Sequence, residues 1–231
     1  MYILIDHRIP DKAKRELAKY GQLLELGKNN ITYEAISSHP DIFCCQTPDK
    51  IILAPNTPIA ILDKFEDLKI DYIFGKNAVG LLYPHTSHYN AVVTHKFVIH
   101  NTKNTDESII ENSYGKEIIS VKQAYTRCNL IALQKNYFIT SDKGIFKQLQ
   151  SNHDFTVIYS NPDQIILPGM KHGFLGGCCG IYQNYLFVTG KLKFLAEEKA
   201  IRFFLDALDM QIIELYDGPL FDGGSIIFIA Q

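Results

Sequence analysis

The sequence has no tryptophan, no surplus of either charge and no apolar run of the roughly 18 residues that a membrane span needs. Lysine plus arginine number 23 and aspartate plus glutamate number 25, which leaves a formal net charge of −2. Because proteins that bind polyanions usually carry a basic surplus, we expect neither a nucleic-acid partner nor a membrane segment. Of the 231 residues, 46% are hydrophobic, as in a chain that folds around a core.

Cysteine is present, but not in the pattern of a disulfide framework or a zinc ribbon. The five cysteines are an odd number, two pairs are adjacent in sequence, and no CxxC occurs. With no signal peptide at the N-terminus, this usage fits a reducing cytoplasm. The sequence lacks a phosphate loop, GxGxxG and GxSxG, and His85 and His88 have no third ligand nearby, so we expect no cofactor and no metal.

One pattern of secondary structure repeats along the chain. Four pairs of short runs rich in β-branched and aromatic residues are each split by a few polar residues, which predicts a β-hairpin. The predicted hairpins span residues 41–55, 90–100, 128–140 and 178–189. A helical pattern and one more strand follow each hairpin, most clearly the helix over 195–208 and the strand over 211–215.

The two ends of the chain together make a fifth unit. Residues 223–231 resemble a first strand with nothing after it, whereas residues 2–26 give a strand, a helix and a strand with no first strand before them. We expect the last strand to pair with the first, which leaves no open edge. The units open at equivalent points, namely Asp41, Asn90, Cys128, Cys178 and Gly224. Their separations are 38 to 50 residues, and the interval that wraps through both ends is 48.

The sequence therefore predicts an α/β fold with a single domain over residues 1–231. Five ββαβ units would form a pseudo-fivefold closed ring, an α/β-propeller whose fifth unit is completed by both termini. A five-bladed all-β propeller has a similar period, but the helical segments argue against it. An ordinary α/β sheet with coincidental spacing is the remaining alternative.

Five ββαβ units around an axis resemble the pentein superfamily, the guanidine-group-modifying enzymes, over the whole chain. The likeness is closest to an uncharacterised bacterial family assigned that fold. The stretches that carry it are LIDHRIP (4–10), AISSHPDIFCCQ (35–46), APNTP (54–58), LPGMKHGFLGGCCG (167–180) and DGGSII (222–227).

The resemblance implies a site at the mouth of the axis. There a cysteine thiolate attacks a guanidinium or amidine carbon, a histidine moves protons, and two carboxylates hold the cation. The family's cysteine usually follows a glycine pair in the last unit, as in GGxxxC, but here Gly223 and Gly224 lead to Phe228. A GGD-like motif should supply an acid in an earlier unit, where residues 176–178 are GGC.

One thiol and two histidines are the candidate catalytic residues. Cys178 is the candidate nucleophile, with Cys179 as the alternative, and both would be packing residues if inert. His172 precedes Cys178 by six residues, and its loop would bring it near. His39, in the His-Pro-Asp tripeptide that opens the first unit, is a candidate general acid or base, although this tripeptide also suits a capped turn.

The candidate ligand-binding residues open the units or end their strands. Carboxylates would anchor a guanidinium or ammonium group, arginine would clamp a carboxylate, and glycine would let the backbone approach a ligand. The set is Asp41, Gln46, Asn90, Arg127, Cys128, Gly177, Asp222 and Ser225. For each of them, a structural role in a turn, a buried strand or a surface salt bridge is the alternative.

Two functions stay open at this point. The first is a small-molecule-binding pentein with its ligand at the axial mouth, acting as a cysteine-dependent hydrolase or transferase on guanidino or amidino compounds. The second is a non-catalytic binding platform for a protein or ribosomal partner, like the anti-association translation factor of this fold. Phe228 at the usual cysteine position favours the second, and the polar residues at the unit starts favour a ligand pocket.

Overall fold

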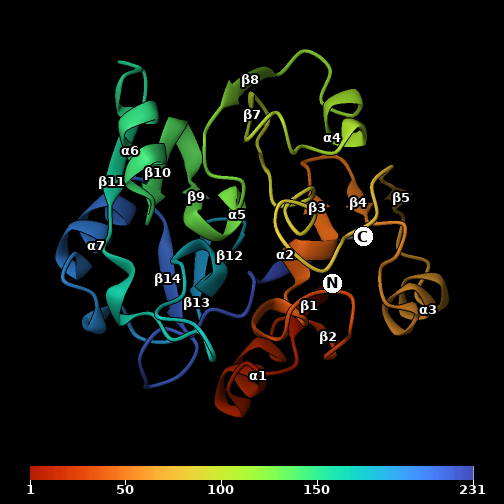
Figure 1. Cartoon of the computed structure of the whole chain (residues 1–231). Coiled ribbons are helices and arrows are strands. Elements are labelled where there is room, and N and C mark those ends of the chain that lie inside the picture. Colours follow the sequence, from red (N-terminus) through yellow and green to blue (C-terminus); the bar gives the residue numbers. More distant parts are fainter. Residues whose placement is uncertain (231) are drawn as a thin grey trace.

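The computed structural model describes residues 1–230, and its strands form five separate three-stranded sheets within a mixed α/β fold (Figure 1). In every sheet the first strand pairs antiparallel with the second, and the second pairs parallel with the third. The sheets are β15 (Ile227–Ile229), β1 (Tyr2–Asp6) and β2 (Gln22–Leu26); β3 (Cys44–Gln46), β4 (Ile51–Leu53) and β5 (Ile73–Phe74); β6 (Val92–Val93), β7 (Phe97–His100) and β8 (Glu117–Ser120); β9 (Leu130–Ala132), β10 (Tyr137–Thr140) and β11 (Thr156–Tyr159); and β12 (Cys179–Tyr182), β13 (Tyr185–Val188) and β14 (Gln211–Glu214).

A helix joins the two parallel strands of each sheet, because parallel neighbours need a crossover connection. These helices are α1 (Asp11–Leu17), α3 (Ile59–Asp67), α4 (Glu107–Glu111), α6 (Lys143–Gln150) and α7 (Glu198–Asp206). Shorter helical turns are α2 (Pro40–Phe43), α5 (Thr126–Asn129) and the 3₁₀ turns Glu34–Ile36, Gln134–Asn136, Pro162–Gln164, Gly176–Cys178 and Leu192–Phe194. None of the described helices is long and apolar enough to cross a membrane.

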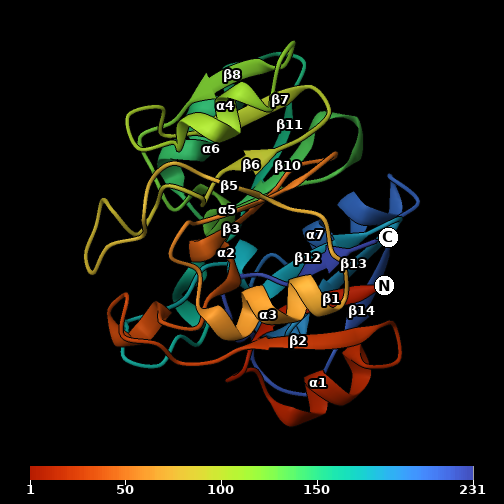
Figure 2. The same ribbon diagram turned by 90° about the vertical axis from the view of Figure 1, so that its right-hand side faces the viewer.

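The first and last strands lie side by side, as the wrapped fifth unit predicts. Ile3 of β1 is the antiparallel partner of Phe228 in β15, and both ends of the chain lie close together in Figures 1 and 2. Phe228 also packs against Phe187 of β13, with ring centroids 4.6 Å apart. Apolar contacts therefore hold the chain ends to each other and to the fourth unit.

The first strands are shorter than the sequence predicts, because a helical turn precedes three of them. The predicted strand from Asp41 begins only at Cys44, after α2, and Cys128 and Cys178 likewise lie in helical turns. Pro40 occupies the first helical position of α2, where its fixed φ suits a helix and its missing N–H is not needed. A turn of three or four residues is too short to produce helical periodicity in the sequence.

Ile3 should be a main contributor to the free energy of unfolding, since its side chain is fully buried where the chain ends meet. We expect Ile3→Ala to lower the free energy of unfolding by about 2–5 kcal/mol, through lost apolar burial and the cavity that remains. Ile118→Ala in β8 is the matched control, because that isoleucine is 47% exposed, and should cost less than about 1 kcal/mol. Urea unfolding measures both; equal losses would contradict the role given to the joined ends.

Candidate functional site

Asn90 lies just before the first strand of the second unit. It connects this segment to the equivalent segments of the first and third units. Its Nδ2 donates to the carbonyl of Asp41 at 3.1 Å, so it contacts the first unit. Its Oδ1 accepts from the backbone N–H of Cys128 at 3.1 Å, and its carbonyl accepts from that of Arg127 at 2.9 Å. One amide side chain therefore fixes three of the five segments relative to one another.

Arg127 and Ser225 extend these hydrogen bonds to the fourth and fifth units. The guanidinium of Arg127 donates to the carbonyls of Gly176 (3.0 Å) and Cys179 (3.1 Å). The backbone N–H of Ser225 donates to the carbonyl of Gly177 at 2.8 Å, and its Oγ to that of Gly176 at 3.2 Å. A Cβ on Gly176 would lie 2.2 Å from the carbonyl oxygen of Arg127, so only glycine permits this approach.

Asp41 closes the sequence of hydrogen bonds between the fifth unit and the first. Its backbone N–H donates to the carbonyl of Gly224 at 3.1 Å, and its Oδ2 accepts from Ser225 Oγ at 2.7 Å. Gly224 has a φ of +64°, and a Cβ there would lie 2.2 Å from Cβ of His39. We call the hydrogen-bonded segments 39–41, 90, 126–128, 176–179 and 222–225 the axial loops.

The thiol of Cys128 lies directly against the Asp41 carboxylate. Its Sγ donates to Asp41 Oδ2 at 3.1 Å and lies 3.2 Å from Nδ2 of Asn90. Burial raises the pKa of Cys128 well above its ordinary value, and the charges of Asp41 and Asp222 raise this pKa further. The free protein therefore holds a protonated thiol next to two carboxylates.

Asp222 provides the second buried carboxylate of the axial loops. Its Oδ1 accepts from the backbone N–H of Gly224 (3.0 Å) and its Oδ2 from that of Phe174 (2.8 Å). A Cβ on Gly177 would lie only 2.0 Å from Asp222 Oδ1, which explains the glycine at that position. Burial raises the pKa of Asp222, whereas the nearby charge of His39 opposes the rise.

His39 and Asp41 carry buried polar atoms without protein partners. Within residues 1–230, three of these atoms have no hydrogen bond: both ring nitrogens of His39 and Oδ1 of Asp41. The nearest carboxylate to the imidazole is Asp6, whose Oδ2 lies 3.8 Å from His39 Nε2 and is itself held by Arg8 at 2.7 Å. Because buried polar groups normally have partners, these atoms are suited to hold a bound polar molecule.

The other predicted catalytic residues, Cys178 and His172, have no hydrogen bond to His39, Asp41 or Cys128. Cys178 is fully buried, its Sγ donates to the carbonyl of Phe174 at 3.3 Å, and burial raises its pKa well above the ordinary value. His172 contacts the carbonyl of Gly173 and the ring of Phe174, and no hydrogen bond joins it to Cys178. Their roles in catalysis stay predictions.

Gln46 and Phe228 lie in strands that follow the axial loops, and they contact each other. Gln46 Nε2 donates to the carbonyl of Phe228 at 2.6 Å, so this amide connects β3 with β15. The ring of Phe228, at the position of the family's cysteine, is buried among aromatic side chains that include Tyr182. It therefore has a packing role.

Four residues near the polar side chains of the axial loops were not among the sequence candidates: Asp6, Arg8, Tyr33 and Tyr125. Tyr33 and Tyr125 join through their hydroxyls at 3.4 Å, and Tyr125 also bonds to Thr86. Burial raises the pKa of both tyrosines, and the neighbouring Cys128 raises it further. Asp6, beside His39, and Arg8 belong to LIDHRIP, which the sequence singled out only as one of the stretches that carry the family resemblance. Neither pair lies at the start of a repeat, so the repeat pattern could not single them out.

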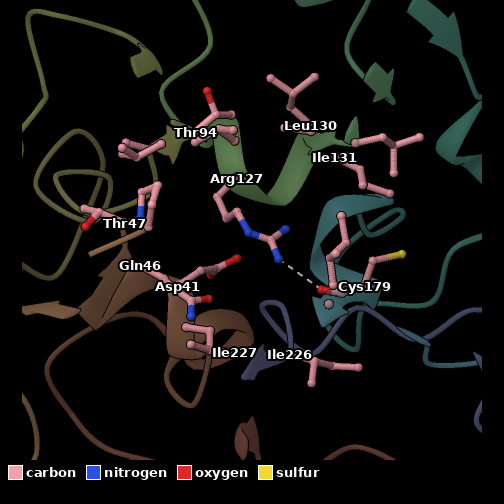
Figure 3. A pocket seen from close by; sticks show the side chains of 18 of the residues that line it. Asp41, Gln46, Thr47, Thr94, Arg127, Leu130, Ile131, Cys179, Ile226 and Ile227 are labelled. Carbon is pink, nitrogen blue, oxygen red and sulfur yellow. Dashed lines mark hydrogen bonds between the residues drawn. The ribbon is translucent and has the colours of Figure 1, made fainter. Parts of the chain in front are cut away.

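A pocket lies between the first strands of the sheets. It has a volume of about 470 Å³, and Asp41 and Arg127 line it together with residues of β3, β6, β9, β12 and β15 (Figure 3). His39, Cys128 and Asp222 are not among its lining residues. We call the buried group of His39, Asp41, Cys128 and Asp222 the thiol site; of its members, only Asp41 also lines this pocket.

Comparison with known proteins gives a family and a set of structural neighbours. A model described as "Family of unknown function (DUF6873)" matches residues 4–227. No curated protein matches the chain. Agmatine deiminase from C. jejuni is 10% identical, with a TM-score of 0.58 over 93% of this chain and 86% of that chain. An amidinotransferase from Microseira wollei in the saxitoxin biosynthetic pathway is 9% identical, with a TM-score of 0.56 over 100% and 94%.

A third neighbour is DDAH from Pseudomonas aeruginosa complexed with citrulline. It is 10% identical, with a TM-score of 0.53 over 92% of this chain and 91% of that chain. All three neighbours are pentein-fold enzymes, and at these identities the likeness shows the fold alone. The fold that the sequence resemblance implied is therefore the fold of these structures.

The raised pKa of Asp222 should appear in the pH dependence of stability. An unfolded aspartate titrates near pH 3.8, so between that value and the raised pKa the native state binds more protons than the unfolded state. The free energy of unfolding of the wild type, relative to Asp222→Asn, should therefore fall as pH rises from about 4 through the raised pKa. Each unit of that rise corresponds to about 1.4 kcal/mol. Urea unfolding from about pH 4 to 8 measures this difference; a pH-independent difference would contradict a raised pKa.

Proposed function

We propose that this chain, which belongs to the DUF6873 family, is a thiol-dependent hydrolase or transferase of guanidino or amidino compounds. The observation that carries the proposal is the contact between the buried Cys128 thiol and the Asp41 carboxylate, with Asp222 close enough to raise the pKa of Cys128 and His39 close enough to affect that of Asp222. One thiol, one imidazole and two carboxylates are the groups that the resemblance to the pentein superfamily implies. The thiol comes from the third unit, not from the last, where Phe228 lies.

Two carboxylates beside a protonated thiol favour a cationic, planar ligand. Asp41 Oδ1 has no hydrogen bond among residues 1–230, so it can accept an N–H of a guanidinium or amidinium group. The positive charge would offset the negative charges of Asp41 and Asp222, which raise the pKa of Cys128 in the free protein. Bound substrate would therefore favour the thiolate that must attack it.

The reaction can be written with these groups alone and water. His39 accepts the thiol proton of Cys128, and the thiolate attacks the guanidinium carbon to form an S–C bond. A C–N bond then breaks, and His39 gives that proton to the leaving amine. Water, deprotonated by His39, attacks the same carbon, and the S–C bond breaks to release a ureido product and the thiol. With an amine in place of water, the amidino group is transferred. Neither ring nitrogen of His39 has a hydrogen bond to any described residue, which supports this role.

The fold and the cysteine usage support the wider setting of this proposal. The structural neighbours include an agmatine deiminase and an amidinotransferase, and both are similar to this chain in fold. We propose that the five sheets form the pseudo-fivefold α/β-propeller, with the small-molecule ligand at the axial loops. The five buried free thiols also suit a cytoplasmic protein.

Non-catalytic binding is the second candidate, because the pKa values of all five cysteines are raised. Burial raises the pKa of Cys45 and Cys179 to about 12, and those of Cys44, Cys128 and Cys178 are well above the ordinary value. Without activation by a cationic ligand, such thiols do not attack carbon. A protein of this kind would bind the same cations and release them unchanged.

Cys128→Ala should abolish turnover, whereas Cys178→Ala should retain it. The assay incubates wild type and variants with agmatine, arginine and N-methylated arginines, with and without an amine acceptor, and measures released ammonia or amine and transferred amidino group. We expect a loss of at least about 1000-fold for Cys128→Ala, since the nucleophile is gone. Cys178→Ala is the matched control, because it removes another fully buried axial-loop thiol.

The same assay separates the two candidates. Saturable binding of a guanidino compound without turnover by the wild type supports the non-catalytic candidate. Turnover that survives in Cys128→Ala, or that disappears in Cys178→Ala alone, would move the chemistry away from Cys128 and refute the proposal.

A further inference from the structure

The pocket between the first strands contains the guanidinium group of Arg127, for which residues 1–230 provide no ion pair. Arg127 extends from α5 toward the middle of the pocket, with Asp41 on one side and Cys179 on the other (Figure 3). Its guanidinium donates to the carbonyls of Gly176 and Cys179, and it forms no ion pair with any described residue. A guanidinium has five N–H donors, so donors remain for a further acceptor.

The walls and the rim of the pocket define what else a ligand would meet. Apolar side chains form much of the wall, among them Val92, Ile131, Ile181 and Ile226. Thr94 and Gln134 contribute polar groups where the strands end. A volume of about 470 Å³ falls in the range typical of small-molecule sites.

We infer that this pocket binds a small monocarboxylate with a short apolar body, its carboxylate held by Arg127. The guanidinium fork matches a carboxylate in shape and charge, and the partly buried setting strengthens the bond. Asp41 lines the same pocket, so its negative charge disfavours ligands with two or more charges. A singly charged carboxylate is therefore preferred to inorganic phosphate.

This pocket differs from the thiol site, although the two share α5 and Asp41. Of the four groups of the thiol site, only Asp41 lines the pocket. The inference does not need Cys128, because the residue that binds the anion is its neighbour Arg127. Cys128→Ala should therefore bind a carboxylate like the wild type, whatever happens to turnover.

The test is a titration of the ¹⁵N-labelled wild type, followed by amide chemical shifts, with butyrate and with its neutral isostere butyramide. We expect saturable shifts for amides of β6, β9 and β12, and binding of butyramide at least about tenfold weaker, because only the carboxylate pairs with Arg127. Inorganic phosphate should bind more weakly than butyrate. Equal affinity for butyrate and butyramide, tighter binding of phosphate, or shifts confined to other parts of the chain would each overturn the inference.

Variants give an independent comparison. Arg127→Gln should weaken butyrate binding at least about tenfold, whereas Arg202→Gln removes a positive charge from α7, outside the pocket, and should leave it unchanged. Unchanged binding in Arg127→Gln would overturn the inference. Arg127 also holds two backbone carbonyls, so if Arg127→Gln does not fold, the comparison of butyrate with butyramide on the wild type decides alone.

Discussion

A carboxylate buried where all five units meet is the constraint on which the rest of this structure depends. Asp41 is 1% exposed, and its Oδ2 accepts hydrogen bonds from Ser225 of the fifth unit and Cys128 of the third. A buried carboxylate without such partners would be strongly destabilising, so the loops that supply them must stay together. Ser225 lies two residues before β15, the strand that pairs with β1, and the hydrogen bond therefore ties this end of the chain to the first unit.

The sequence predicted much of this arrangement, because the repeat assigns equivalent positions to residues that are far apart in the chain. Asp41, Asn90 and Cys128 open successive units, and they are hydrogen-bonded to one another. The sequence did not indicate which of the five cysteines lies against a carboxylate, as Cys128 does against Asp41. The glycine-rich run drew attention to Cys178, but its glycines serve close packing: Gly176 admits the carbonyl of Arg127. Which thiol faces a carboxylate depends on packing between units, and a single sequence does not encode this visibly.

The axial loops carry two chemically different groups. Asp41 contacts the protonated thiol of Cys128, whose pKa burial and the charges of Asp41 and Asp222 raise, whereas Arg127 lies in the pocket between the first strands. Both depend on the same hydrogen bonds, because Arg127 and Cys128 are consecutive residues of α5. In the proposed reaction, activation of the thiol requires that negative charge nearby be offset, so binding of a cation would increase its nucleophilicity.

The most direct measurement compares alkylation of the native protein by chloroacetamidine, a cation, and chloroacetamide, its neutral analogue, with the modified cysteine identified by mass spectrometry. We expect the amidine to modify Cys128 selectively and faster than the amide does, because Asp41 and Asp222 attract the amidinium and its charge favours the thiolate. Asp41→Asn should remove most of that preference. Equal rates for the two reagents, or modification of Cys178 before Cys128, would refute the role proposed for Cys128.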